Sequence, residues 1–297
     1  CECAFDRDYG KRTNLKKVNI PEGITEIGEM AFFGSSVERV VFPKSLKKIG
    51  KSAFHRCKSL KEIVLPEGLQ TMEEYAFWEC ENLSKVVLPA SLKELPGHAF
   101  ADCVNLTDVV FSEGLTKIGD SAFSSCRKLS DVRIPNTVRI IGEFAFSYCK
   151  SLVTIRIPSG VQKLKTHLFA GCSNLYRVEL PETITEIWKE AFFNCENLTF
   201  INLPNAITKI SVGAFTGCRS LADVKLPPNL TTLREWAFFN CDSIKELVVP
   251  EGIVELEEGV FAGCRSLISI RIPESVTNIS LRAFSGCDHL QRDLIMY

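Results

Sequence analysis

Cysteine is the residue type with the most capacity for chemistry in this 297-residue sequence, which contains thirteen of them. Thiols pair as disulfides, bind metals and act as nucleophiles. Eleven recur at a fixed interval of 23 residues, and they are Cys57, Cys80, Cys103, Cys126, Cys149, Cys172, Cys195, Cys218, Cys241, Cys264 and Cys287. A zinc ion or iron–sulfur cluster needs ligands that converge on one point, whereas a regular column places its thiols along a line. The spacing therefore disfavours a metal site in the cysteine column.

Disulfides between successive column cysteines are also disfavoured. Stacked β-coils lie about 4.7–4.9 Å apart, and their side chains point the same way, so neighbouring Cβ atoms are also nearly that far apart. The usual Cβ separation across a disulfide is about 3.5–4.5 Å. The spacing therefore predicts a ladder of buried thiols that behave as small hydrophobic side chains, with weak S–H groups near turn carbonyls.

The four histidines form no catalytic or metal-binding pattern. His98 and His167 share a column but lie three repeats apart, roughly 14 Å by strand spacing, too far to share one metal ion. The sequence contains no Ser-His-Asp arrangement, no Gly-rich phosphate loop and no His-Glu-x-x-His motif. We therefore predict no catalytic residue, no metal and no cofactor.

Composition narrows the class of partner. The net charge is −1, with 35 basic and 36 acidic residues spread along the chain. The sequence has no basic stripe, so we do not expect nucleic acid or an anionic membrane as the partner. No apolar run approaches the length of a membrane-spanning helix. The 45% hydrophobic content is sufficient for a large core.

A phenylalanine column shows how the chain is organised. Its members are Phe32, Phe54, Phe77, Phe100, Phe123, Phe146, Phe169, Phe192, Phe215, Phe238, Phe261 and Phe284. The first interval is 22 residues and every later interval is 23, and each phenylalanine from Phe54 onward precedes a column cysteine by three positions. A fixed period of this length indicates a repeat protein of about twelve units.

Each repeat contains two apolar stretches and a turn. In residues 60–66, the alternation of Ile63 and Leu65 predicts a half-buried strand that Pro66 ends, because proline cannot donate to a β-ladder. Residues 69–72 predict a second short extended segment, and the Ala-Phe-x-x-Cys spacing predicts one helical or 3-10 turn. We expect an α/β solenoid with short parallel strands, in which the phenylalanines stack in a single file.

The pattern Leu-x-x-Ile-x-Leu-Pro-x-x-Leu-x-x-Ile-x-x-x-Ala-Phe-x-x-Cys resembles the BspA-like leucine-rich-repeat proteins. The resemblance runs from Leu15 to Leu290. It implies a right-handed leucine-rich-repeat superhelix on a microbial or protist surface protein, often an adhesin for host matrix proteins. We expect residues 15–290 to form the solenoid, residues 1–14 a degenerate N-terminal repeat or cap, and residues 291–297 a truncated or irregular end.

The chain opens Cys1-Glu2-Cys3 without an initiator methionine, so we expect a processed form or a piece of a longer protein. Cys1 and Cys3 lie outside the cysteine column. Three alternatives stay open for them: a reactive or paired thiol, the lipidated N-terminus of a lipoprotein at Cys1, and a cloning remnant.

The outward strand positions are the candidate binding site. Because side chains alternate along a strand, the positions that flank Ile63 face outward, on what would be the concave side of the solenoid. The residues that we expect to bind a partner are Val41, Val64, Val87, Val110, Arg133, Arg156, Tyr176, Arg177 and Phe200. Tyrosine, phenylalanine and arginine commonly anchor interfaces, although valine also suits any strand.

A second aromatic group follows the phenylalanine column on the turns, at Phe33, Trp78, Phe193 and Phe239. We interpret it as half-buried packing between turns. The sequence thus predicts a non-enzymatic protein-binding module of a cell-surface or secreted protein. Two alternatives are an architectural spacer within a larger surface protein and an intracellular scaffold, and the unpaired thiols favour the scaffold because oxidising compartments normally pair cysteines.

Overall fold

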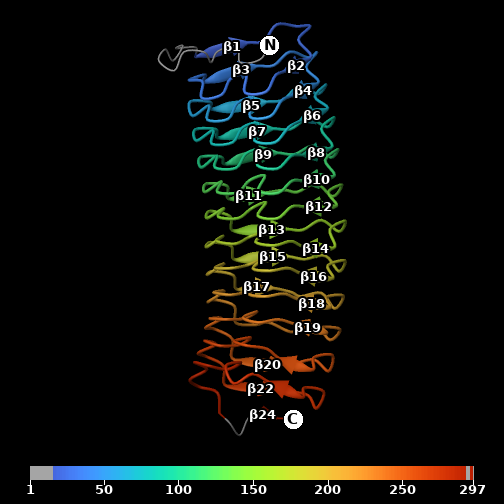
Figure 1. Cartoon of the computed structure of the whole chain (residues 1–297), viewed down its shortest axis with the longest axis vertical. Helices are drawn as coiled ribbons and strands as arrows, with labels where there is room; N and C mark the ends of the chain where they lie inside the picture. The colour runs from blue at the N-terminus through green and yellow to red at the C-terminus, as the bar shows by residue number, and fades with distance from the viewer. Residues whose placement is uncertain (1–15, 292–294, 297) are drawn as a thin grey trace. The chain divides into compact units, whose positions relative to one another are not determined.

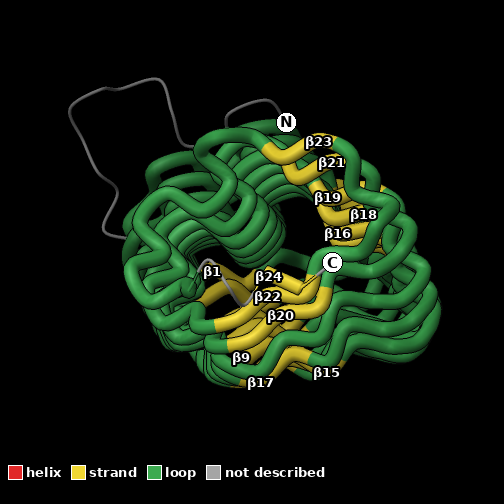
Figure 2. Tube along the Cα trace, turned by 90° about the horizontal axis from the view of Figure 1, so that it is seen from below, coloured by secondary structure: helices red, strands yellow, loops and turns green. Residues whose placement is uncertain are grey.

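The protein, seen in a computed structural model, is described for residues 16–291 and 295–296. The chain forms two compact units, Cys1–Leu152 and Val153–Tyr297. Each unit is a stack of similar coils, in which strands of two or three residues lie on one side of the coil and two-residue strands lie on another (Figures 1 and 2). The predictions for Cys1, Cys3 and residues 1–14 concern residues outside the described part of the chain.

In the N-terminal unit, one parallel sheet contains the strands β1 (Lys17–Asn19), β3 (Arg39–Val41), β5 (Glu62–Val64), β7 (Lys85–Val87) and β9 (Asp108–Val110), and β11 (Asp131–Val132) follows beside β9. The two-residue strands are β2 (Glu26–Ile27), β4 (Lys48–Ile49), β6 (Thr71–Met72), β8 (Glu94–Leu95), β10 (Lys117–Ile118) and β12 (Ile140–Ile141). They form two short parallel sheets, β2-β4-β6 and β8-β10-β12. We refer to the two sides as the long-strand face and the short-strand face.

In the C-terminal unit, the long-strand face contains β13 (Thr154–Arg156), β15 (Arg177–Glu179), β17 (Phe200–Ile201), β20 (Glu246–Val248), β22 (Ser269–Arg271) and β24 (Ile295–Met296). The short-strand face contains β14 (Lys163–Leu164), β16 (Glu186–Ile187), β18 (Lys209–Ile210), β19 (Thr232–Leu233), β21 (Glu255–Leu256) and β23 (Asn278–Ile279). Residues 221–227 form no strand, so the long-strand face is interrupted between β17 and β20.

The register of the sheets follows the sequence period. Glu62 pairs with Lys85, one period of 23 residues later, and the strands of the described residues pair in parallel on both faces. The shorter first interval also keeps the stack in register, since Lys17 pairs with Arg39. The missing residue therefore falls in the loop between Phe32 and the next strand, where it disturbs neither sheet.

The phenylalanine column is the centre of the core in each unit. In the N-terminal unit, the ring of Phe77 stacks on Phe54 with centroids 5.0 Å apart and on Phe100 with centroids 5.4 Å apart. In the C-terminal unit, Phe215 stacks on Phe192 at 5.2 Å. These rings are fully buried. The single file of phenylalanines that the sequence predicts is confirmed within each unit.

The predicted helical or 3-10 turn is wrong, because the described residues contain no helix. Alternate N–H groups donate to different coils: the N–H of Cys57 bonds the carbonyl of Phe54 at 3.1 Å, but the N–H of Phe54 bonds Ala76 in the next coil at 2.8 Å. A 3-10 helix needs consecutive local bonds. The segment is instead a series of tight turns with Ser52 and Arg56 at positive φ, 53° and 61°.

Several residues other than glycine have a left-handed backbone conformation, and one of them, Ser121, gives a first testable prediction. Ser121 has φ of 54°, a region that costs an L-residue roughly 1–2 kcal/mol and glycine much less. We expect Ser121→Gly to raise the free energy of unfolding by about 0.5–1 kcal/mol, measured by urea titration. Ser130→Gly is the control, since Ser130 is exposed and has no positive φ. Equal destabilisation by both changes would contradict the argument.

Candidate interaction surfaces

Outward valines of the N-terminal unit line a groove on the long-strand face. Val41, Val64 and Val87 alternate with buried residues, and 61% of Val64 is exposed. The groove has a volume of 570 Å³, and Phe42 and Pro66 also line it. Val110 continues this valine stripe one coil further on and is exposed. The structure thus places the four predicted valines on the outer surface, while their role in binding stays a prediction.

Charged pairs lie beside the valine stripe. Arg39 approaches Glu62 at 3.5 Å, and Lys61 donates to Glu38 at 2.8 Å. The hydrogen bond and charge of Lys61 hold the pKa of Glu38 below its ordinary value. Because these pairs are exposed, their contribution to stability is small. Arg39 and Glu62 also line the groove and give it a polar rim of the kind found around protein interfaces.

Arg133 is the last predicted residue of the N-terminal unit. Its side chain is 92% exposed, and its guanidinium lies 3.7 Å from the carboxylate of Asp131 in β11, the strand that ends just before it. A charge that is so exposed and so weakly paired retains its capacity to meet an acidic group on another molecule.

The predicted residues of the C-terminal unit form a second surface. Tyr176 and Phe200 are 51% and 49% exposed. The guanidinium of Arg177 lies 5.0 Å from the centroid of the Phe200 ring, within cation–π range, and 3.2 Å from Glu179. Arg156 is exposed on the neighbouring strand β13. The structure brings Arg177 and Phe200 into contact on this face, and the role of all four residues in binding stays a prediction.

A further groove on this face was not among the predicted sites. It lies around Val248 of β20, which is 61% exposed, and has a volume of 680 Å³. Leu226 and Pro250 line it, and so does Lys225, which lies in the strandless stretch. The sequence could have indicated this groove, because Val248 is an apolar residue in an outward strand column whose immediately preceding members are polar or charged.

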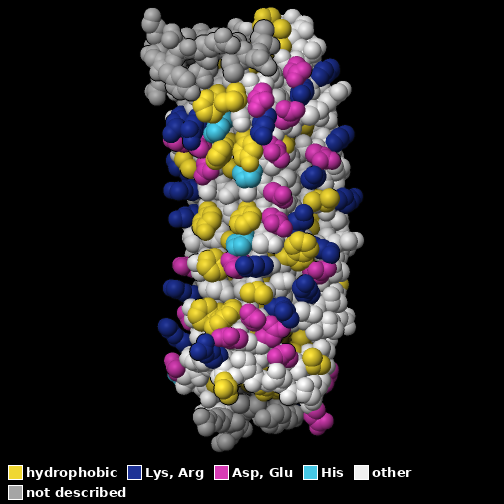
Figure 3. Space-filling model, viewed as in Figure 1, with side chains coloured by type: hydrophobic (Ala, Val, Ile, Leu, Met, Phe, Trp, Pro, Cys, Tyr) yellow, Lys and Arg dark blue, Asp and Glu magenta, His cyan; other side chains and the backbone are white. Residues whose placement is uncertain are grey.

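The turn side carries an aromatic cluster in the N-terminal unit. The rings of His55 and Trp78 stack with centroids 4.5 Å apart, and Phe33 meets the edge of His55 at 4.8 Å. Burial of His55 lowers its pKa, so the neutral ring is favoured. Figure 3 shows histidine among hydrophobic side chains on this side. Phe33 and Trp78 are half-buried, as are Phe193 and Phe239 of the C-terminal unit, which agrees with packing between turns.

The cysteine column is a ladder of free thiols, as predicted. The thiols donate to the carbonyl of the phenylalanine in the preceding coil, for example Cys80 to Phe54 at 3.1 Å and Cys218 to Phe192 at 3.2 Å. Burial raises the pKa of Cys57 to about 12 and that of the less buried Cys287 to about 11. A thiol held protonated is a poor nucleophile and metal ligand, so the column is structural.

Across residues 16–291, no group of three or more His, Cys, Asp or Glu side chains is arranged to hold a metal ion. Among the described residues no helix is both long and apolar enough to span a bilayer.

Parallel coils with an apolar core column and an outward strand face define a leucine-rich-repeat solenoid, the class of repeat protein whose exposed face commonly binds other proteins. Models of the BspA type leucine rich repeat region match residues 6–107, 93–221 and 185–295. The chain belongs to this family. The hand of the coil stays a prediction.

Solved structures of bacterial proteins share this fold. A leucine-rich repeat protein from Bacteroides ovatus is 25% identical, with a TM-score of 0.73 over 93% of this chain and 74% of that chain. One from Eubacterium ventriosum is 22% identical, with a TM-score of 0.51 over 84% and 77%. The pneumococcal vaccine antigen PcpA is 20% identical, with a TM-score of 0.50 over 90% and 75%. No curated protein matches the chain.

Proposed function

We propose that this protein is a non-enzymatic recognition module that binds another protein through its long-strand face. The partner is an extracellular matrix or host surface protein, and the module acts in adhesion at a microbial cell surface. The resemblance to the BspA-like family supports the surface role.

The observation that carries the proposal is the valine groove of the N-terminal unit. A contiguous apolar groove framed by charged pairs is the composition of an interface core with a polar rim. Val41, Val64 and Val87 project from strands whose backbones are fixed by neighbours on both sides. A rigid surface of this kind binds without a large loss of conformational freedom.

The C-terminal unit supports the same proposal independently. Exposed tyrosine, phenylalanine and arginine side chains contribute much of the binding energy of many interfaces. Tyr176, Arg177 and Phe200 are three such residues on adjacent coils.

The thiol ladder bears on the compartment. Unpaired cysteines favour an intracellular scaffold as the second candidate function, because oxidising compartments normally pair thiols. The burial of the column thiols makes their unpaired state compatible with a surface role as well. A thiol such as Cys126 is fully enclosed and held protonated, so oxidants reach it only when the coil opens.

The groove can be tested with one substitution in the N-terminal unit. We expect Val64→Glu to weaken binding to the matrix component that the wild-type protein captures by roughly tenfold or more, because a carboxylate in an apolar contact loses its hydration. Fibronectin, laminin and collagen on biosensor surfaces are suitable probes, and cytosolic lysate provides the comparison for a scaffold.

Ile140→Glu is the matched control, since Ile140 is an exposed aliphatic residue on the short-strand face of the same unit. It should leave binding within about twofold of wild type. Arg133→Glu combined with Tyr176→Ala tests the remaining predicted residues in the same assay. If neither this variant nor Val64→Glu weakens binding, the long-strand face is not the binding site. If the wild-type protein captures none of the matrix proteins, the spacer role is favoured instead.

A further inference from the structure

Each strand on the long-strand face of the N-terminal unit begins with a charged residue. We call these residues the charge column, and from β1 to β11 they are Lys17, Arg39, Glu62, Lys85, Asp108 and Asp131. All of them are exposed. Because they lie on consecutive coils, the column follows the stacking axis of the unit (Figure 1).

The charges of this column follow a particular order. From β1 to β11 their signs are positive, positive, negative, positive, negative and negative. Each charge is therefore opposite in sign to the one at the same distance on the other side of the midpoint, which lies between Glu62 and Lys85. A surface with this order is complementary to a copy of itself turned end over end.

The valine stripe has the same midpoint. Its inner members, Val64 and Val87, lie on β5 and β7, and its outer members, Val41 and Val110, lie one coil further out on either side. Val41, Val64 and Val110 are 44%, 61% and 48% exposed. An apolar stripe beside a charge column with the same centre provides the core and the rim of an interface between two identical chains.

Pairing within the chain leaves much of this charge available. Arg39 lies 3.5 Å from Glu62, and both side chains remain about half exposed or more. Lys85 and Asp108 are neighbours in the strand register, yet these two described residues form no ion pair with each other. Asp108 accepts a hydrogen bond from Thr107 at 2.8 Å. The column can therefore still pair with charges on another molecule.

We propose that the long-strand face of the N-terminal unit binds the same face of a second copy of this chain, so that the protein forms an antiparallel dimer. The two-fold axis runs parallel to the strands, midway between β5 and β7. Val64 then packs against Val87 of the second copy, and Glu62 meets Lys85 of the second copy.

The outer coils extend the same complementarity. Under this two-fold axis, Arg39 meets Asp108 of the second copy, and Lys17 meets Asp131 of the second copy. Symmetry makes each of these contacts twice. Every member of the charge column thus meets a charge of the opposite sign.

The other possible face-to-face arrangement is disfavoured. A two-fold axis parallel to the stacking axis would set the charge column of one copy against the valine stripe of the other. Charges buried against an apolar surface without a partner are costly. The two columns together therefore select one orientation of the second copy.

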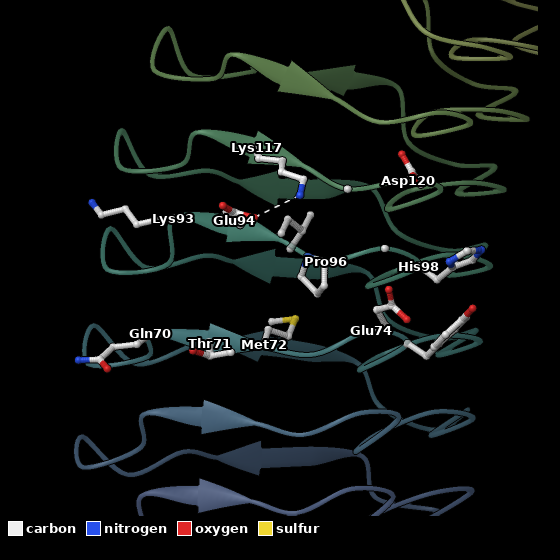
Figure 4. A pocket seen from close by; sticks show the side chains of 14 residues that line it. Gln70, Thr71, Met72, Glu74, Lys93, Glu94, Pro96, His98, Lys117 and Asp120 are labelled. Atoms are coloured by element: carbon white, nitrogen blue, oxygen red, sulfur yellow. Dashed lines mark hydrogen bonds and ion pairs between the residues drawn. The ribbon is translucent and has the colours of Figure 1, made fainter.

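The short-strand face of the same unit provides a comparison. Its strands begin at Glu26, Lys48, Thr71, Glu94, Lys117 and Ile140. The same two-fold operation would set Lys48 against Lys117 of the second copy, and like charges repel. Lys117 lies 3.3 Å from Glu94 of its own chain, beside a groove of 600 Å³ (Figure 4). The order of charges therefore distinguishes the long-strand face from the short-strand face.

The dimer is expected to be weak and reversible. Strands about 4.8 Å apart give the face of the N-terminal unit a length of about 24 Å, which places the interface at the lower end of the range for specific complexes. We expect a dissociation constant of roughly 10–100 µM. Because the ion pairs lie at the rim, added salt should weaken the dimer.

The dimer uses the same face as the proposed function but does not depend on a matrix partner. Self-association is measured on the protein alone, whereas matrix capture is measured on an immobilised component. A monomeric protein that captures a matrix component would overturn the dimer and leave the proposed function in place. A dimer that captures none of them would do the reverse.

Sedimentation equilibrium of the full chain, at concentrations from about 1 to 300 µM, tests the dimer. We expect Glu62→Lys to weaken association roughly tenfold or more, because the new lysine faces Lys85 of the second copy. Lys85→Glu should have the same effect, because the new glutamate faces Glu62 of the second copy. Glu246→Lys is the matched control, since Glu246 is the exposed first residue of β20 in the C-terminal unit. It should associate as wild type does.

An equimolar mixture of Glu62→Lys and Lys85→Glu is the decisive sample. In a mixed dimer the lysines at these two positions of one chain meet the glutamates of the other, so association should return to the wild-type level. A defect in folding would not be repaired by mixing. The proposal is overturned if the wild-type protein remains monomeric up to about 300 µM, or if either single variant associates as wild type does. It is equally overturned if the mixture stays monomeric, or if Glu246→Lys weakens association as much as Glu62→Lys.

Discussion

The free energy of unfolding is expected to fall steeply as the pH rises above about 9, the ordinary thiol pKa. Burial raises the pKa of several column thiols, among them Cys126 and Cys195, and raises that of Cys57 to about 12. A group with a raised folded-state pKa stabilises the protein fully below the unfolded pKa, and that contribution is lost as the pH rises toward the folded value. Each such thiol lowers stability by about 1.4 kcal/mol per pH unit in this window. Several together should unfold the protein near pH 10–11.

Guanidinium titrations at several pH values between 7 and 10.5 measure this slope. The matched variant is Cys57→Ala, which should be less stable at pH 7 but should show a slope smaller by about 1.4 kcal/mol per pH unit. Thiol counting at pH 8 gives a second readout: the buried cysteines should react only after denaturation, and Cys287 should react first because it is the most exposed of the column. A flat stability profile up to pH 10.5 would exclude a ladder of buried, protonated thiols.

The other large effect is expected in the aromatic core. Phe77→Ala should lower the free energy of unfolding by about 3–5 kcal/mol, because the ring is fully buried and the rings on either side fix the cavity that it leaves. Coils contact only their neighbours along the stack, so the loss is expected to open the N-terminal unit first. Urea unfolding followed by circular dichroism measures the total loss, and amide exchange locates it.

Phe200→Ala is the comparison for this change. Phe200 is half exposed on the strand face, so its removal should cost about 1 kcal/mol or less. If the two substitutions cost the same, the phenylalanine column is not the principal source of stability that its burial indicates.

The repeat and its strands could be predicted because their signal is periodic. The interval between Phe54 and Phe77 fixes the stacking register, and the alternation around Ile63 fixes which residues face outward. Both features were confirmed, and they place Val64 and its column neighbours on the surface. Whether that surface binds a partner is a property of another molecule, which this sequence does not encode.

The turn could not be predicted in the same way. The i, i+3 spacing of Phe54 and Cys57 fits a 3-10 helix and a series of tight turns equally well. The choice between them depends on the N–H of Phe54, whose partner belongs to the following coil. Local spacing carries no information about that bond.

The loop after Phe32 shows where this architecture tolerates changes in length. A residue is absent there, yet Lys17 and Arg39 still pair and the rings of Phe32 and Phe54 still stack at 4.8 Å. A codon gained or lost at this corner therefore leaves the neighbouring modules intact. Genes for such arrays can accordingly grow, shrink and recombine by whole modules, and imprecise junctions are absorbed at the corners while the outward columns diversify.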